Sequence, residues 1–392
     1  MKILVGLFVV LFALGMRVSA TPNISAQIAV VMCYETGEVL YDRNMEQRWI
    51  PSSMTKIMTA FITYQEIEAG NLTLNTNVRV SANAATFSQN RRIEGSFVPL
   101  QQGNITVEML LRLMMLPSSN GAAVVLAEHI SGTEAAFVER MNETAYELGM
   151  YASFTNSHGA IAHHSNAYSI ALLMREFIRL YPDILRITAM QTVTHGGTTY
   201  NNTNRLLFSN HYFSGADGFK TGVIRASGWG HSTTAVRDGR RVIAVLMNTT
   251  SNDRRQNESR ILLQFGFDEL ARRDAAAAAR VRVFNGGRAI PLDAPAVLDR
   301  GQLFLPMGDV LRALGFRLTW DGASRVATAT DTDGSQITIF VDRNIATVRG
   351  TSTTLRTPAR MVDNRVYIPL EIIQAITGTQ TSWDFETGVV QI

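Results

Sequence analysis

Two lysines stand out as candidate acid–base groups, because lysine is almost absent from this chain. Of its 36 basic residues only Lys2, Lys56 and Lys220 are lysines. Arginine stays protonated in proteins, whereas a lysine can lose its proton where its surroundings disfavour the charge. Lys56 and Lys220 are therefore the first candidates for catalysis.

Lys56 ends the motif Ser-Met-Thr-Lys at residues 53–56, and we expect this motif to begin a helix that runs from about Pro51 to Glu68. A spacing of three residues places Ser53 and Lys56 on one helix face. The helix N-terminus adds free N–H groups and partial positive charge near Ser53. A serine becomes nucleophilic when a base removes its proton, and a lysine whose pKa is lowered by burial and by a second cation can be that base. Alone, the motif is weak evidence, since surface helices also contain it.

Two further motifs could line the same site. Ser118-Ser119-Asn120 lies in a turn, where Ser118 could relay a proton and Asn120 could hold a substrate amide or Lys56. Lys220-Thr221-Gly222 on a strand would offer a charge and a hydroxyl to an anionic substrate end. The missing side chain of Gly222 would let a peptide lie alongside that strand. Each motif alone is compatible with an ordinary loop or strand.

Taken together, the three motifs resemble the set shared by penicillin-binding proteins and class A β-lactamases. Residues 25–270 resemble the low-molecular-mass penicillin-binding proteins, which are serine-type D-alanyl-D-alanine carboxypeptidases. The matching segments are Pro51–Ala60, Met141–Met150, Asn156–Gly159 and Asp217–Gly222. The resemblance implies a serine peptidase that removes the terminal D-alanine from peptidoglycan stem peptides and takes part in cell-wall biogenesis and the control of cell shape. It also implies that β-lactams are covalent inhibitors.

The resemblance also implies a role for each motif residue. Ser53 would be the acylated nucleophile and Lys56 its base, with Ser118 as a third catalytic residue. The backbone N–H groups of Ser53 and Val223 would form the oxyanion hole. The expected substrate-binding residues are Asn120, Lys220, Thr221, Gly222 and Val223. We expect no cofactor and no metal.

Several positions depart from the usual pattern of this family. Gly121 stands where an Asp commonly follows the motif Asn, and Ile224 replaces a Thr often found after Lys-Thr-Gly. The segment Asn156–Ala160 reads Asn-Ser-His-Gly-Ala instead of Asn-Pro-His-Gly-Leu. These changes bear on turnover rate and substrate preference more than on reaction type. A catalytically weak or inactive, wall-associated scaffold is therefore the alternative hypothesis.

A β-lactamase would use the same three motifs. Class A enzymes also carry a glutamate that activates the deacylating water, and no Glu-x-x-Leu-Asn occurs between Ser118 and Lys220. A zinc peptidase is disfavoured because His-Glu-x-x-His is absent. The adjacent His163 and His164 should point in different directions, which argues against a shared metal.

Composition and the N-terminal segment bear on the compartment. Residues 1–20 read as a signal peptide, which we expect to be cleaved after Ala20, so that the protein is exported and acts on the cell-wall or periplasmic side. An uncleaved anchor is the alternative. The formal charge is only +3, and the arginines occur as scattered pairs, which argues against nucleic-acid binding. The single cysteine, Cys33, lies in an apolar run and should be a buried hydrophobe.

The order of apolar segments predicts an α/β fold for the catalytic part. Strands at both ends of residues 21–274, with helices between them, indicate one sheet covered by helices. With the resemblance, the expected fold is an antiparallel sheet flanked by helices, as in serine β-lactamases and penicillin-binding proteins. An alanine-rich segment at 275–280 should end a helix and act as a linker.

Residues 281–392 contain an internal repeat with an offset of 63. Gly287 matches Gly350, Pro306 matches Pro369, and the Trp-Asp pair at 320–321 matches the pair at 383–384. Two such units would bury apolar faces against each other in a smaller α+β domain. The segment resembles the stalk domain first named from the N-terminal region of copper amine oxidases, but it lacks histidine and cysteine ligands for copper. Its expected role is contact with the cell wall or surface.

Overall fold

The computed structural model describes residues 21–299 and 301–392. The expected signal peptide lies outside the described residues. Within them, no helix has the length and apolar character needed to cross a membrane. Contacts divide the chain into two compact units, of which the second consists of Leu270–Ile392 together with Cys33–Leu40 and Ala235–Val242.

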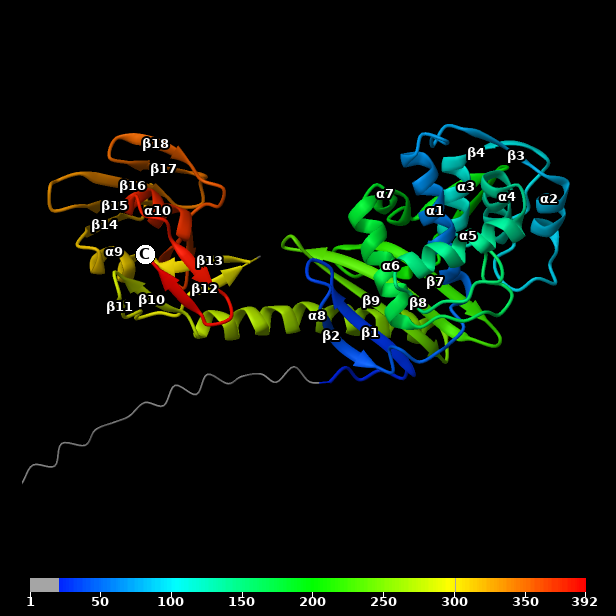
Figure 1. Cartoon of the computed structure of the whole chain (residues 1–392), viewed down its shortest axis with the longest axis horizontal. Coiled ribbons are helices and arrows are strands. Elements are labelled where there is room, and N and C mark those ends of the chain that lie inside the picture. Colours follow the sequence, from blue (N-terminus) through cyan, green and yellow to red (C-terminus); the bar gives the residue numbers. More distant parts are fainter. Residues whose placement is uncertain (1–20, 300) are drawn as a thin grey trace, which may run out of the picture. The chain divides into compact units, whose positions relative to one another are not determined.

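A five-stranded sheet forms the centre of the first part of the chain (Figure 1). Its strand order is β2-β1-β9-β8-β7. The strands are β1 (Ile28–Cys33), β2 (Val39–Arg43), β7 (Ala216–Ile224), β8 (Gly228–Arg237) and β9 (Arg240–Thr249). The two N-terminal strands lie beside the last strand, which confirms the expected sheet built from both ends of this region. Cys33 is completely buried at the end of β1, as expected.

Helices cover both faces of this sheet. In Figure 1, α1, α6 and α7 lie on one side of the strands and α8 lies on the other. On the α8 side, Phe265 packs edge-on against Tyr41 and the Arg255 guanidinium lies over the Trp229 ring. The helices are α1 (Lys56–Glu68), α2 (Ala82–Gln89), α3 (Val107–Met115), α4 (Asn120–Ser131), α5 (Glu134–Glu147), α6 (Ala167–Leu180), α7 (Ile184–Thr188) and α8 (Asn252–Ala279). Two small antiparallel sheets of two strands each pair β3 (Asn77–Val80) with β4 (Gly103–Thr106), and β5 (Thr192–His195) with β6 (Thr198–Asn201).

The alanine run is the last part of α8, which continues to Ala279. Ala277 and Ala278 are buried and pack with Leu298 and Trp383. The boundary expected after residue 274 therefore falls inside a continuous helix, because alanine favours helix and its small side chain fits a tight contact.

The repeat of 63 residues is visible in the C-terminal unit as matching elements. Each half has four strands, a short helix and two strands. The first half consists of β10 (Arg282–Asn285), β11 (Arg288–Ile290), β12 (Val297–Asp299), β13 (Gln302–Pro306), α9 (Met307–Ala313), β14 (Arg317–Asp321) and β15 (Val326–Thr330). The second half consists of β17 (Ile345–Val348), β18 (Thr351–Thr354), β19 (Arg360–Val362), β20 (Arg365–Pro369), α10 (Leu370–Thr377), β21 (Ser382–Asp384) and β22 (Val389–Gln391). The extra strand β16 (Gln336–Phe340) joins them.

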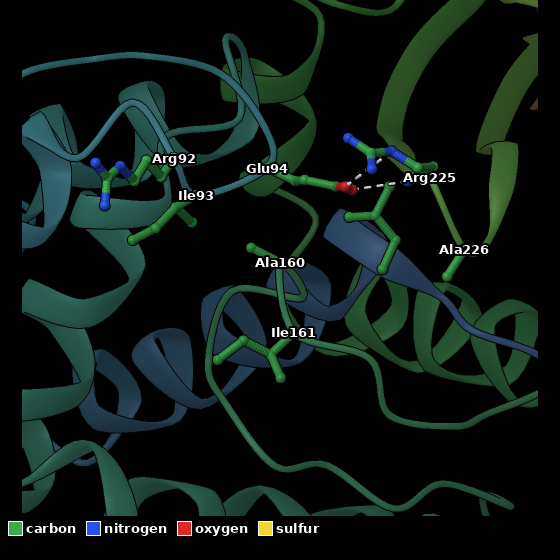
Figure 2. A pocket seen from close by; sticks show the side chains of 8 residues that line it. Arg92, Ile93, Glu94, Ala160, Ile161, Arg225 and Ala226 are labelled. Carbon is green, nitrogen blue, oxygen red and sulfur yellow. Dashed lines mark hydrogen bonds and ion pairs between the residues drawn. The ribbon is translucent and has the colours of Figure 1, made fainter.

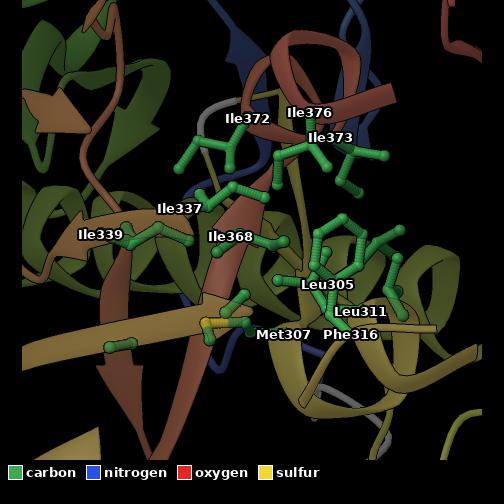
Figure 3. Close-up of a cluster of buried hydrophobic side chains, with 14 of the residues drawn as sticks. Leu305, Met307, Leu311, Phe316, Ile337, Ile339, Ile368, Ile372, Ile373 and Ile376 are labelled. Atoms are coloured by element: carbon green, nitrogen blue, oxygen red, sulfur yellow. The ribbon is translucent and has the colours of Figure 1, made fainter. Parts of the chain in front are cut away.

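The two halves are interleaved rather than side by side. Strand β10 pairs in parallel with β22, and β13 pairs with its own counterpart β20 so that Leu305 faces Ile368. Their apolar side chains share one core, which includes Met307, Leu311 and Ile372 (Figure 3). Neither half could bury these side chains alone, which is the physical reason for the repeat.

Candidate active site

Ser53 lies in a tight turn that precedes the first long helix. Residues Ser52–Thr55 form a 3₁₀ turn, and α1 begins at Lys56. Because a 3₁₀ helix has three residues per turn, positions three apart lie on the same side of it. The Nζ atom of Lys56 lies 3.0 Å from the Oγ atom of Ser53. Ser52, directly before Ser53, has a φ angle of +52°, a strained conformation for a non-glycine residue.

The amine of Lys56 contacts three oxygen atoms and is completely buried. Besides Ser53 Oγ, it contacts the Oδ1 atom of Asn120 at 2.7 Å and the backbone carbonyl of His158. A carbonyl oxygen can only accept, so Asn120 and His158 take two N–H donors. A neutral amine has two N–H groups and one lone pair, and the lone pair is then left for the hydroxyl proton of Ser53. The contacts therefore fit an uncharged Lys56.

Electrostatics favour the same uncharged state. Burial, reinforced by the positive charge of Lys220, lowers the pKa of Lys56 well below its usual value. No carboxylate is among the hydrogen-bond partners of its amine in the described chain. Lys56 is thus placed and poised to take the proton of Ser53.

In the second motif, Ser118-Ser119-Asn120, only Asn120 is hydrogen-bonded to Lys56. Asn120 is the first residue of α4, and its amide joins Lys56 to the backbone carbonyl of Glu94, to which Nδ2 donates at 3.0 Å. Ser118 is buried, with a φ angle of +71°. Within residues 21–299 and 301–392, the Ser118 hydroxyl makes no hydrogen bond to a protein group. No hydrogen bond therefore joins the Ser118 hydroxyl to Ser53 or Lys56 in the described chain.

The third motif lies on β7. Lys220 is 1% exposed, and burial together with the positive charge of Arg255 lowers its pKa to about 7. The hydroxyl of Thr221 donates to the hydroxyl of Thr203 at 2.7 Å. Arg255 comes from α8 and donates to the backbone carbonyl of Gly222 at 3.4 Å. Arg255 and Thr203 could not be found from the sequence, because neither belongs to a short motif and only the fold brings them to β7.

The structure requires a glycine at position 222 for a reason that differs from the expected one. Its missing side chain does not face open space beside the strand. A Cβ atom there would lie 2.7 Å from the Pro51 carbonyl oxygen and 3.2 Å from the Ser52 Cβ. Glycine is therefore needed so that β7 can approach the turn that carries Ser53, and the expected reason, room for a substrate, is corrected.

A loop at residues 156–160 holds Lys56 through the His158 carbonyl, a role that the sequence did not indicate. The Asn156 side chain accepts from the backbone N–H of Gly159 at 2.6 Å, which fixes the loop and aims the His158 carbonyl at Lys56. Burial lowers the pKa of the His158 ring to about 3, so the ring is neutral at pH 7. The segment was part of the family resemblance, which was the only available signal.

The adjacent histidines point apart, as expected. The Nε2 atom of His163 lies 2.7 Å from the Thr55 hydroxyl, whereas the Nδ1 atom of His164 lies 2.9 Å from the Arg48 guanidinium. Across the described part of the chain, no group of three or more His, Cys, Asp or Glu residues is placed to hold a metal ion.

The lowered pKa of Lys220 predicts a pH-dependent stability difference. Between about pH 7 and 10.5 the unfolded chain binds a proton at this lysine that the folded chain does not, so this group makes folding more favourable as the pH rises. We expect wild type to gain stability relative to Lys220→Met as the pH rises from 7 to 10, with the variant the more stable at pH 7. Urea unfolding at three pH values measures this. The control Arg79→Met should show a constant difference, since arginine stays protonated.

Two family models match different parts of the chain. Residues 15–251 match the family model described as D-alanyl-D-alanine carboxypeptidase, and residues 284–392 match the model of the copper amine oxidase N-terminal domain. The chain is 33% identical over 264 residues to D-alanyl-D-alanine carboxypeptidase DacF of Bacillus subtilis (strain 168), which covers 65% of each protein. It is 34% identical over 249 residues to DacD of Escherichia coli (strain K12), which covers 62% of this chain and 64% of that protein. The chain thus spans less than two thirds of the length of these curated relatives.

Solved structures show the same fold. Penicillin-binding protein 6B from Escherichia coli is similar with a TM-score of 0.59 and 34% identity, over 63% of this chain and 78% of that one. Penicillin-binding protein D2 from Listeria monocytogenes, in its cefotaxime-bound form, has a TM-score of 0.56 and 28% identity, over 62% of this chain and 98% of that one. The predicted fold, an antiparallel sheet with flanking helices, is confirmed. With the family model matched over more than half of its length, the chain belongs to the D-alanyl-D-alanine carboxypeptidase family.

Proposed function

We propose that this protein is a serine-type D-alanyl-D-alanine carboxypeptidase that acts on peptidoglycan stem peptides. The observation that carries the proposal is the buried Lys56 amine, 3.0 Å from Ser53 Oγ and hydrogen-bonded to two obligate acceptors. Uncharged Lys56 takes the proton of Ser53 as Oγ attacks the carbonyl carbon of the penultimate D-alanine. The N–H groups of Ser53 and Val223 bind the oxyanion. The proton then passes to the leaving amine, the C–N bond breaks, and water hydrolyses the resulting ester.

The other motif residues are assigned roles in the same reaction. Ser118, whose hydroxyl makes no hydrogen bond to protein groups in the described chain, relays the proton to the leaving amine. Asn120 holds Lys56 and the substrate amide. Lys220 and Thr221 bind the substrate carboxylate beside Gly222. Removal of a single oxyanion donor commonly lowers the rate by about 10²–10³.

β-Lactams enter the same chemistry. Attack of Ser53 on the lactam carbonyl opens the ring and leaves an ester. Without a glutamate dedicated to deacylation this ester is long-lived. Penicillin-binding protein D2, a structural neighbour, was solved in cefotaxime-bound and ampicillin-bound forms, which supports the proposal.

Mass spectrometry of the purified protein tests the function directly. We expect one penicillin per chain, with the added mass on the peptide that contains Ser53, and release of free D-alanine from a D-Ala-D-Ala peptide. Covalent capture without D-alanine release would favour the inactive scaffold. Rapid release of opened penicillin would favour a β-lactamase, and an adduct elsewhere would remove the assignment of Ser53.

The expected site of action is extracytoplasmic, because peptidoglycan lies outside the cytoplasmic membrane. We propose that residues 1–20 direct export and are cleaved after Ala20. Determining the N-terminal sequence of protein secreted by a bacterial host tests this, and an uncleaved Met1 would contradict it.

For the C-terminal unit we propose contact with glycan strands of the wall. Its five-stranded sheet, β14-β15-β16-β17-β18, buries Ala327, Ile337 and Ala346 on one side. On the other side, hydroxyl residues stand directly opposite one another on all five strands, and we call this line the hydroxyl row. Its members are Thr319, Thr328, Thr338, Thr347 and Ser352. Neighbouring strands are about 4.8 Å apart, a spacing comparable to one sugar residue, so that a glycan lying across the strands meets one hydroxyl per sugar.

A charge placed in the middle of the hydroxyl row tests this contact. We expect Thr338→Glu to lower the fraction of protein that sediments with insoluble peptidoglycan by about threefold or more, because a central carboxylate loses its water under a bound glycan. The matched control is Thr332→Glu, an exposed turn residue in the same unit. Equal sedimentation of wild type and both variants would contradict the proposal.

A further inference from the structure

A cleft of about 580 Å³ lies beside the catalytic cluster, by which we mean the hydrogen-bonded Ser53, Lys56 and Asn120. None of its lining residues belongs to the three motifs. Three segments form its walls (Figure 2). They are the loop at 92–94, the loop at 160–161, and the end of β7 with the turn after it, at 224–226. The side chains that line it are Arg92, Ile93, Glu94, Ala160, Ile161, Ile224, Arg225 and Ala226.

Each wall is hydrogen-bonded to the catalytic cluster or follows directly from it. The Glu94 carbonyl accepts from Asn120, and the Glu94 carboxylate accepts from the backbone N–H of Arg225 at 2.7 Å. Ala160 follows Gly159, which packs on the Ser52 carbonyl. The cleft is therefore held in a fixed relation to Ser53.

The direction of β7 decides which part of a substrate reaches the cleft. Along this strand, Lys220 and Thr221 come first, Val223 follows, and Ile224 ends the strand. A peptide whose terminal carboxylate lies at Lys220 and whose scissile carbonyl lies at Val223 has its preceding residues beside Ile224 and Arg225. Because each strand residue advances about 3.3 Å, the cleft begins one to two residues before the scissile bond.

The charges of the cleft define what it can recognise. Figure 2 shows the Arg225 guanidinium beside the Glu94 carboxylate, with the Nε and Oε1 atoms 3.8 Å apart, and Arg92 on the other side. Two guanidinium groups face one carboxylate, so the lining carries one net positive charge. Ile93 and Ile161 supply apolar surface between them. A long side chain can lie on these isoleucines while its charged end meets the rim.

We propose that this cleft binds the residue that precedes the D-Ala-D-Ala end and selects a long side chain that ends in a carboxylate beside an ammonium group. Arg225 or Arg92 would bind the carboxylate, and Glu94 the ammonium group. A side chain with only an ammonium group would face the net positive charge of the rim. The inference rests on the proposed carboxypeptidase function for the orientation of the peptide.

Three pentapeptides that differ only in the residue before D-Ala-D-Ala test the proposal. They carry meso-diaminopimelate, diaminopimelate with an amidated side-chain carboxylate, or L-lysine. For wild type we expect kcat/KM for D-alanine release to be about three- to tenfold higher for the free carboxylate than for the amide, the range of an exposed charge-assisted contact. The kcat/KM of the L-lysine peptide should equal that of the amidated peptide or be lower.

Variants assign the effect to the cleft. Arg225→Gln combined with Arg92→Gln should bring the ratio of the first two peptides close to one, whereas Arg79→Gln, an exposed arginine of β3, should leave the ratio as in wild type. A wild-type ratio near one, or a ratio that the double variant does not change, overturns the inference. Dissociation constants of the same peptides for Ser53→Ala, measured by calorimetry, give the ratio without turnover. A failure of the proposed function is therefore distinguishable from a failure of this inference.

Discussion

The Lys56→Arg variant is expected to lose acylation by penicillin by a factor of about 10²–10⁴, the usual contribution of a general base. Arginine keeps the positive charge but cannot give up its proton, so it cannot accept the proton of Ser53. Lys56 is also completely buried, and its two carbonyl partners leave only the lone pair of a neutral amine for Ser53. The rate of labelling by a fluorescent penicillin measures the loss.

Because a guanidinium is larger than an amine, a second variant separates chemistry from packing. Lys56→Met has a similar length and no base, and it should lose acylation to the same extent. Ser53→Ala lacks the nucleophile and is the negative control for labelling. Circular dichroism reports whether each variant is folded. A folded Lys56→Arg or Lys56→Met protein that is labelled at close to the wild-type rate would contradict the role of Lys56 as base.

The regular elements around the site could be predicted because local signals agree with the fold. The helix from Lys56 to Glu68 ends two residues before Gly70, and the helix at 107–115 begins after Thr106, whose side chain accepts from the Met109 N–H as an N-cap. Such signals act over a few residues and need no knowledge of the rest of the chain. The parallel pairing of β10 with β22, more than 100 residues apart, leaves no local trace.

The same distinction applies to the active site. Ser53 and Lys56 were predictable because one turn of helix brings them together. The His158 carbonyl and the Arg255 guanidinium reach the site only through tertiary packing, from a loop and from α8. A backbone carbonyl has no sequence signature, and a single arginine among many gives no signal. The His158 carbonyl helps to leave Lys56 its lone pair. The Arg255 charge adds to the effect of burial, which lowers the pKa of Lys220.

The second large effect concerns the loop that holds Lys56. In Gly159→Ala, the new Cβ atom would lie 1.9 Å from the Ser52 carbonyl oxygen and 2.4 Å from its carbonyl carbon. Real atoms cannot approach so closely, so either the loop or the turn that carries Ser53 must move. Since a displacement of about 1 Å can lower a rate by 10², we expect penicillin acylation to fall by about 100-fold or more.

The chain offers a matched control for backbone strain. Gly159 and Gly149 have φ angles of +77° and +67°, but a Cβ atom at Gly149 would meet nothing within 4 Å. Gly149→Ala should therefore have only the cost of the left-handed conformation, on the order of 1 kcal/mol of folding stability, with normal acylation. If Gly159→Ala were acylated as fast as Gly149→Ala, the contact of the loop at 156–160 with the turn at Ser52–Thr55 would not position Ser53. Loss of acylation in the first variant alone would show that the catalytic turn depends on a loop more than 100 residues further along the chain.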